Sequence, residues 1–242
     1  MTTKYKKKVY LLMLAEECNR CKDMIQFIED IVNHKSEDLK KSERDILSFA
    51  YNKSISSRRK ALKKINALET KERKKKNSTC LLYITEYKKK IEDELTELCQ
   101  GILKTIDEKL FKLAEESEAE VFYLKMKGDY NRYIAEYAEG DLKKKVSDDA
   151  LKSYESASII AKDLPALNPI VLGLAFNFSV FYYDIINDPK KAIEIAKTAM
   201  DEADKELYYI NEDSEKHKES VSLFYQLKEN IDIWVKKEEG NQ

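Results

Sequence analysis

The chain has 242 residues, of which 43% are apolar and 37% are charged, and it contains only five glycines and three prolines. This apolar content excludes a disordered chain, and the scarcity of helix-breaking residues favours long helices with one exposed face. The formal net charge is −1, so no overall basic field indicates a nucleic-acid-binding protein. We interpret the short lysine runs as solvated helix faces or loops.

The first half of the chain is predicted to be helical, because apolar residues recur with a helical period and no segment alternates like a strand. A first pair of helices ends within residues 33–45, where Ser42 and Asp45 form a variant capping box that opens a long helix. A polar, lysine-rich loop is expected at 70–79, followed by a second long helix.

The second half continues the helical pattern with short connections. The helix that begins in the segment AEESEAE ends near Gly140, and Asp141 caps the next helix. Pro169 is suited to the first turn of an apolar helix, which NDP at 187–189 separates from its successor. NEDS at 211–214 is expected to start the last helix, which reaches Trp234. The sum is an all-α, layered array of about nine helices without a fixed repeat period.

The longest apolar run, IVLGLAFNFSVFYYDII at 170–186, raises the question of a membrane span. A span needs about 20 such residues, and this run is shorter and contains Asn177, Ser179 and Asp184. We interpret it as a central, largely buried helix of a protein without a membrane partner.

The cysteines and histidines indicate neither disulfides nor a metal site. Four cysteines and no secretory leader pattern predict a reducing, cytoplasmic location, with the nucleus as a second one. Cys18 and Cys21 form a CxxC that lacks a second pair or a nearby histidine, so thiols are favoured over a zinc site. His34 and His217 are given no role.

Catalytic motifs are absent: there is no phosphate-binding glycine loop, no nucleophile elbow and no HExxH. Acidic residues on the lysine-rich helices are most simply intrahelical ion pairs. We therefore predict that the protein is not an enzyme and has no catalytic residues and no cofactor.

Two helices combine an apolar face with a polar stripe. On one, Asn52, Ser56, Arg59 and Lys63 share a face, which is either a solvated basic stripe or part of a site. On the other, YLKMKGDYNRYIAEY at 123–137, Arg132 stands beside Tyr133, which indicates either a solvated face or half of an anion site.

Two asparagines lie in otherwise apolar helical surroundings. Asn177 shares a face with Val180 and Asp184, and Asn230 precedes Trp234 by one helical turn. A buried asparagine without partners costs roughly 1–3 kcal/mol. Either the core satisfies these amides, or they face a groove and bind the backbone of a ligand.

Five segments together resemble the 14-3-3 proteins. They are LAEECNRCKDM, ERDILSFAYNKSISSRRK, VFYLKMKGDYNRYIAE, LNPIVLGLAFNFSVFYYDIIND and QLKENIDIW, and they occur in the family's order and at its distances. The resemblance implies nine antiparallel helices in an L-shaped protomer with a concave amphipathic groove. It also implies a single domain over residues 1–236 with a short C-terminal tail at 237–242.

The resemblance implies a groove that binds phosphoserine or phosphothreonine peptides. Arg59, Arg132 and Tyr133 match the family's phosphate-binding residues. The positions that match the rest of the peptide groove are Asn52, Lys63, Lys125, Asn177, Val180, Asp184, Leu223, Leu227, Asn230 and Trp234. The sequence departs from the family at Asn52, where the family has a lysine, and at Lys63, where it has an arginine. Because Lys53 is turned by about 100° from Asn52 on a helix, we expect it to point away from Arg59.

The resemblance also implies a homodimer, or a heterodimer with another family member. The matching cross-dimer ion pairs are Arg20 with Glu94 and Asp23 with Lys90, and the matching contact positions are Leu14, Cys18, Ala61 and Tyr87. Alternatively, Lys90 and Glu94 form an intrahelical pair and the first helix is solvated.

Two functions remain open on the sequence. The first is a dimeric adaptor that clamps or sequesters phosphorylated client proteins. The second is a helical scaffold, similar to a tetratricopeptide protein, that binds partners without phosphate dependence.

Overall fold

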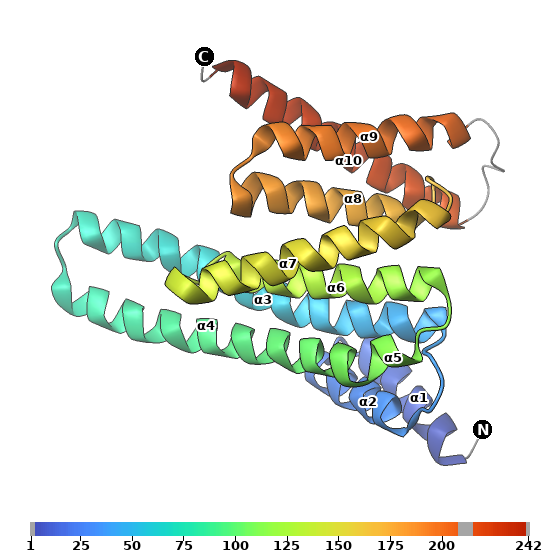
Figure 1. The fold of residues 1–242 in the computed structure, drawn as a ribbon. Coiled ribbons are helices and arrows are strands. Elements are labelled where there is room, and N and C mark those ends of the chain that lie inside the picture. The colour runs from blue at the N-terminus through green and yellow to red at the C-terminus, as the bar shows by residue number, and fades with distance from the viewer. Residues whose placement is uncertain (1–2, 208–214, 241–242) are drawn as a thin grey trace. The chain divides into compact units, whose positions relative to one another are not determined.

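The computed structural model describes residues 3–207 and 215–240, which are helical or in short connections and contain no strand (Figure 1). The all-α prediction is therefore confirmed for this part of the chain. The chain forms two compact units, Met1–Ala114 and Glu115–Gln242. Nine helical runs are described when each irregular turn is counted with the helix it continues. The single domain over residues 1–236 stays a prediction.

The N-terminal unit is a succession of antiparallel helices built around a long hairpin. Its elements are α1 (Thr3–Glu17), α2 (Cys21–His34), α3 (Lys41–Lys74) and α4 (Ser78–Thr105), the last continued by the π-helical turn η1 (Ile106–Leu110) and α5 (Phe111–Leu113). Each of the helices α1, α2 and α3 packs on the next one along the chain (Figure 1). Fully buried aliphatic side chains such as Met24, Leu47 and Leu95 form the core between them.

The start of α3 differs from the prediction. The helix begins at Lys41, and Glu43 rather than Asp45 acts on its first turn, because the Glu43 carboxylate accepts a hydrogen bond of 2.8 Å from the Lys40 amide. Glu43 also accepts hydrogen bonds from the Lys35 ammonium at 2.5 Å and from the Tyr5 hydroxyl. Burial by itself would raise the pKa of Glu43, but these three hydrogen bonds hold it below its ordinary value. The Ser42–Asp45 capping box was therefore wrong.

The predicted loop at 70–79 is mostly helical. α3 continues to Lys74 and α4 begins at Ser78, so only residues 75–77 connect them. Glu69 pairs with Arg73 one turn later at 2.5 Å and with Lys88 of α4 at 3.3 Å, and the Asn77 side chain caps α4. Lysine, arginine and glutamate are good helix formers, so ion pairs of this kind extend a helix into a charged segment.

The C-terminal unit is arranged around α8. Its elements are α6 (Ser117–Ala135), α7 (Gly140–Ile160) with the turn η2 (Ala161–Asp163), α8 (Pro169–Phe181) with the π-helical turn η3 (Tyr182–Ile186), α9 (Pro189–Leu207) and α10 (Glu215–Gly240). α8 contacts α6, α7, α9 and α10 (Figure 1). The predicted start of the last helix at 211–214 lies outside the described residues. The helix passes Trp234 and continues to Gly240, through most of the predicted tail.

The apolar run is confirmed as a central helix. By length and composition, Pro169–Ile186 is the one helix among the described residues that could cross a membrane, and its packing on four helices of its own unit accounts for that composition. The expectation that it is largely buried was too strong, because only 28% of these residues are buried. Much of its apolar surface is therefore only half-covered.

A glycine sets the spacing of α6 and α7. A Cβ atom added at Gly128 would lie 2.5 Å from the Tyr154 ring, a distance that no side chain tolerates. Gly128 and Tyr154 are both buried, so the ring lies directly against the backbone of α6. This close approach brings the Tyr154 hydroxyl to the polar residues that follow Gly128.

We expect Gly128→Ala to lower the free energy of unfolding by about 1–3 kcal/mol, because the new methyl group overlaps the Tyr154 ring. Gly101→Ala is the matched control in α4. Nothing lies within 4 Å of its added Cβ, so the better helix former should stabilise by up to about 1 kcal/mol. Urea unfolding followed by circular dichroism measures both. Effects of the same sign would contradict this account of α6–α7 packing.

Candidate functional site

Six polar side chains of the C-terminal unit form one connected group, which we call the Asp129 cluster. Its members are Lys125, Asp129 and Arg132 of α6, Glu136 at the C-cap of the same helix, Tyr154 of α7 and Asn177 of α8. The α6 residues lie three or four apart, so the helix presents them on one side. The cluster therefore draws on three helices of the same unit.

Asp129 is the shared acceptor. Its Oδ2 accepts hydrogen bonds from Lys125 Nζ at 2.8 Å and from Asn177 Nδ2 at 2.9 Å, and its Oδ1 accepts one from the Tyr154 hydroxyl at 2.7 Å. The residue is 5% exposed. A buried carboxylate is costly unless it is paired and hydrogen-bonded, and these three donors meet that need.

Arg132 is held from several sides. Its Nε donates to the Tyr154 hydroxyl at 3.3 Å, its Nη1 donates to Glu136 Oε1 at 3.2 Å, and its guanidinium lies 4.5 Å from the centre of the Tyr133 ring. Its Nη2 is 3.9 Å from Asp129 Oδ1 and makes no hydrogen bond to the described residues of this unit. The guanidinium is thus oriented while donors remain on Nη2.

The protonation states follow from burial and from the neighbours. Burial by itself lowers the pKa of Arg132. The nearby Tyr154, Tyr133, Asp129 and Glu136 raise it by more than burial lowers it, so the net change is upward. Burial and the Asp129 carboxylate raise the pKa of the Tyr154 phenol well above 10.0. Arg132 is therefore a permanent cation, and Tyr154 is a neutral hydroxyl that both donates and accepts.

The formal charges of the cluster cancel, because two cations, Lys125 and Arg132, face two carboxylates, Asp129 and Glu136. Such a group can offer oriented N–H donors to an anion without carrying excess positive charge in its absence. Firm binding of a dianion would need at least one more cation. No group of three or more His, Cys, Asp or Glu side chains suited to a metal ion occurs in the described residues.

The sequence left open whether the core satisfies the Asn177 amide or whether the amide faces a groove, and the structure answers this in part. One N–H of its amide is bonded to Asp129, so an intramolecular partner satisfies it while the side chain stays half-buried. The other predicted groove residues of this unit divide by exposure. Asp184 is exposed, Val180, Leu223 and Asn230 are half-buried, and Leu227 and Trp234 are buried.

The two buried residues belong to the core. Leu227 is fully buried among α8, α9 and α10, and Trp234 stacks on the Tyr183 ring at a centroid distance of 4.7 Å. In this structure Leu227 is therefore a core residue, and the half-buried Leu223 packs against the same core.

The remaining predicted phosphate and peptide residues lie in the N-terminal unit, on α3. Asn52 and Arg59 are half-buried and Lys63 is exposed, and the Asn52 amide donates to Ser48 Oγ at 3.0 Å. The Lys53 ammonium is engaged by the Asn19 side chain and lies 5.1 Å from the centre of the Phe49 ring. The convergence of Arg59 with Arg132 and Tyr133 stays a prediction.

The predicted dimer positions also lie in the N-terminal unit. Leu14 and Tyr87 are 42% and 57% exposed, Cys18 and Lys90 are exposed, and Ala61 is half-buried. Arg20 pairs with Asp23 within the chain, and Glu94 pairs with Arg58 at 3.3 Å. The alternative Lys90–Glu94 pair is not among the ion pairs of the described residues.

Sequence reasoning missed Tyr154 and the role of Gly128. The glycine inside a helical pattern was the available signal, because such a glycine costs about 1 kcal/mol and often marks a close approach. No comparable signal singles out Tyr154, whose partner Asp129 is 25 positions away.

Comparison with known proteins identifies the family of the chain. The family model described as "14-3-3 protein" matches residues 11–235. The chain belongs to the 14-3-3 family.

Several 14-3-3 relatives align over nearly their whole length. A 14-3-3-like protein of Pisum sativum is 42% identical over 235 residues, which are 96% of this chain and 90% of the relative. A 14-3-3 protein homolog of Trichoderma harzianum is 42% identical over 95% of this chain and 87% of its own. The 14-3-3-like protein G-BOX factor 14 lambda of Arabidopsis thaliana is 42% identical over 94% of this chain and 92% of the relative.

Membership of the 14-3-3 family decides the general function. Its members are non-enzymatic adaptors that bind phosphopeptides, so the chain is an adaptor of this kind and not an enzyme.

We expect Tyr154→Phe to lower the free energy of unfolding of this 14-3-3 protein by about 1–2 kcal/mol, because it removes a donor to Asp129 and an acceptor for Arg132. Tyr225→Phe, at a side chain that is 62% exposed, is the control and should change nothing. Trp234, the only tryptophan, reports unfolding by fluorescence. Equal stability of the two variants would mean that the hydroxyl does not stabilise the cluster.

Proposed function

We propose that the protein is a dimeric adaptor that clamps or sequesters client proteins through phosphoserine or phosphothreonine segments. The observation that carries this proposal is Arg132, which the Asp129 cluster orients while donors on its Nη2 remain. Membership of the 14-3-3 family supports the same ligand.

Phosphate fits such a guanidinium better than a hydroxyl does. A phosphate dianion accepts several charge-assisted hydrogen bonds, and a guanidinium fork matches two of its oxygens. Each such bond contributes roughly 1.5–3 kcal/mol. An unphosphorylated serine offers one neutral hydroxyl, so the preference for phosphoserine arises at Arg132 itself.

A second cation is needed because the charges of the Asp129 cluster cancel. Arg59 of α3 is the residue that we propose for this role, with Tyr133 as a further donor. Asn177 and Asn230 would bind the peptide backbone, and Val180 and Leu223 would contact its side chains. Because backbone contacts carry no side-chain preference, one groove could accept many clients.

Asn52 makes the proposed phosphate site weaker in cations than a site with lysine at that position. Lys53 does not compensate, since its ammonium is engaged with Asn19 and Phe49. We therefore propose that this chain relies on its two arginines more heavily than a protein with a groove lysine.

The proposed dimer uses exposed apolar side chains of the N-terminal unit. On α1, Tyr10, Met13 and Leu14 are 62%, 52% and 42% exposed, and on α4 Leu82 and Tyr87 are 66% and 57% exposed. Exposed apolar side chains that gather into a patch mark interaction sites, and these residues lie on the helices that the proposed contact uses. A two-fold contact between copies, or with another 14-3-3 protein, would cover them and give two linked peptide sites in the cytoplasm or nucleus.

We expect Arg59→Ala to weaken binding of a fluorescent phosphoserine peptide by about 10- to 100-fold, because a charge-assisted bond is lost. Arg58→Ala is the matched control, since it removes the same charge from the adjacent position, where the side chain pairs with Glu94. Fluorescence anisotropy with the phosphorylated and unphosphorylated forms of one peptide measures both.

Two further variants sharpen this experiment. Arg132→Lys keeps the charge but loses the fork, so it should also reduce the preference for phosphate. Asn52→Lys adds a cation and should tighten binding by about tenfold. Equal binding of the serine and phosphoserine peptides to the wild-type protein would instead support the phosphate-independent scaffold, which the absence of a groove lysine favours.

We expect the double variant Leu14→Glu, Tyr87→Glu to raise the dissociation constant of the dimer by more than about tenfold, because it places charges in an apolar contact. Tyr225→Glu, at an exposed aromatic residue of α10, is the control. Sedimentation velocity at micromolar protein distinguishes the two. A wild-type protein that is monomeric at every concentration would rule out the dimer.

A further inference from the structure

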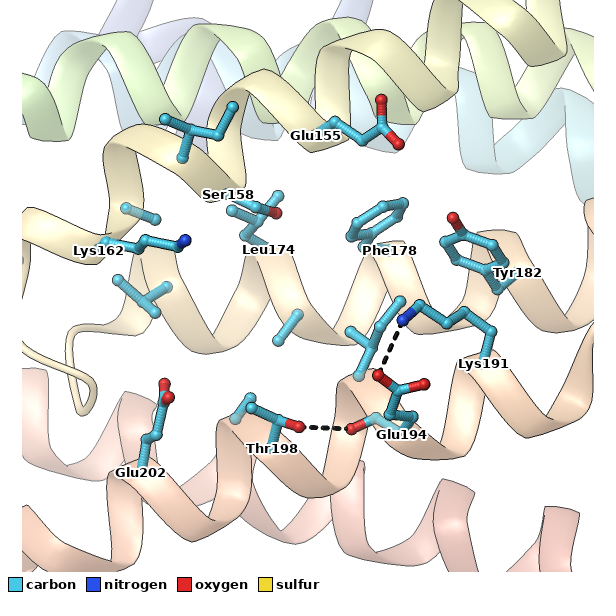
Figure 2. Close-up of a pocket in the computed structure, with 16 residues that line it drawn as sticks. Glu155, Ser158, Lys162, Leu174, Phe178, Tyr182, Lys191, Glu194, Thr198 and Glu202 are labelled. Atoms are coloured by element: carbon cyan, nitrogen blue, oxygen red, sulfur yellow. Dashed lines mark hydrogen bonds and ion pairs between the residues drawn. The ribbon is translucent and has the colours of Figure 1, made fainter.

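A second surface of the C-terminal unit has the features of a binding site, and it is separate from the Asp129 cluster. It is a groove of about 620 Å³ between α7 and α9, with α8 as its floor (Figure 2). We call it the α7–α9 groove. Its floor extends from Val171 to Tyr182, and its walls are formed by residues 155–162 of α7 and the following turn η2 and by residues 191–202 of α9.

The floor of the groove is a regular apolar stripe. The residues that line it are Val171, Leu174, Ala175 and Phe178 of α8 and Tyr182 of η3, which lie at i, i+3, i+4, i+7 and i+11. Asn177 and Val180, which the phosphopeptide proposal uses, lie between these positions in sequence and are not among the lining residues. α8 therefore presents two different faces.

Both walls repeat part of this spacing. The pattern i, i+3 and i+4 is followed on α9 by Ile195, Thr198 and Ala199, and on α7 by Glu155, Ser158 and Ile159. Stripes with this spacing on neighbouring helices form the ridges and holes into which another helix packs. Ser158, Ala175 and Ala199 are small, so they leave holes that larger side chains of a partner could fill.

The groove is incompletely covered in the described structure. Among the floor residues, Leu174 and Phe178 are buried, whereas Val171, Ala175 and Tyr182 are only half-buried. Ile159 on the rim is 67% exposed. Apolar surface collected in a groove, rather than scattered singly, indicates a partner.

The charges at the rim define the partner's chemistry. Lys191 and Glu194 neutralise each other at 2.8 Å. Glu155 lies beside Tyr182 at one end of the groove and helps burial to raise the pKa of that phenol. Glu202 lies at the other end, on the opposite wall (Figure 2). Among the described residues, neither Glu155 nor Glu202 has an ion-pair partner. Lys162 is the one lysine lining the groove that is not in an ion pair with another described residue.

We propose that the α7–α9 groove binds an amphipathic helix of a partner protein, about three turns long, that carries lysine or arginine near both ends. The eleven steps along the chain from Val171 to Tyr182 span about 16 Å at 1.5 Å per residue, which sets that length. Apolar residues of the helix at i, i+4 and i+7 enter the holes. Its basic ends pair with Glu155 and Glu202.

An open groove with three periodic stripes fits a helix better than a compact small molecule, which binds in more enclosed pockets. The inference is independent of phosphopeptide binding. If both are correct, a client could contact the protein at two separate places, and its affinity would rise without a change at the phosphate site.

The test uses the full chain and a synthetic fluorescent peptide of about fifteen residues, with leucines at i, i+4 and i+7 and lysines at both ends. We expect saturable binding by anisotropy. Glu155→Lys with Glu202→Lys should weaken it about tenfold or more, because two attractions become repulsions. Asp201→Lys is the matched control. It makes the same charge change beside Glu202 but outside the groove, and should change binding less than about twofold.

A steric variant tests the apolar part. Ala199→Trp should fill the groove and lower affinity at least tenfold, while circular dichroism and phosphopeptide binding stay as in the wild type. A peptide with glutamate in place of each lysine, and one with a central proline, should both bind at least tenfold more weakly than the parent.

Several results would overturn the proposal. The first is failure of the lysine peptide to bind, and the second is an equal loss in the Asp201→Lys control. Displacement of the peptide by a phosphopeptide, or its loss in Arg59→Ala, would place it in the phosphopeptide groove. A change of oligomeric state in Ala199→Trp would assign the surface to a second copy of the chain.

Discussion

The carboxylate of Asp129 is the constraint on which the C-terminal unit depends. It is buried, and it is stable there only because α6, α7 and α8 each provide a donor, from Lys125, Tyr154 and Asn177. Removing one donor would leave a buried charge poorly compensated. The absence of a side chain at Gly128 admits the Tyr154 ring, so the packing of two helices and the orientation of Arg132 have one physical origin.

This arrangement supports the proposed role of Arg132, because a buried guanidinium keeps oriented donors there. Arg132 is 5% exposed, yet Glu136, Tyr154 and the Tyr133 ring fix its direction rather than consume all of its donors. A fixed donor loses little entropy when an anion binds. The central helix α8 contributes Asn177 to this cluster, and its Leu174 and Phe178 form the floor of the α7–α9 groove.

The helices of this chain were largely predictable, because their period and their start signals are local. Pro169 does lie in the first turn of α8, and Asn168 caps that helix. The errors have a local cause as well. In the segment at 70–79, composition suggested a loop, but Glu69 forms ion pairs with Arg73 and Lys88 that favour helix. At the start of α3, Glu43 accepts a hydrogen bond from the backbone of Lys40 in the first turn. Its other partners, Lys35 and Tyr5, lie too far away in sequence for helical spacing to reveal them.

By itself, the sequence determined the helices, the i,i+4 pair of Arg132 with Glu136 and, through its five family-like segments, membership of the 14-3-3 family. The tertiary structure decided which polar groups satisfy one another. Asp129 meets Tyr154 across 25 positions and Asn177 across 48. Helical periodicity describes neighbours within a few turns, whereas these contacts depend on how whole helices pack, and that packing is set by buried shapes such as the one at Gly128.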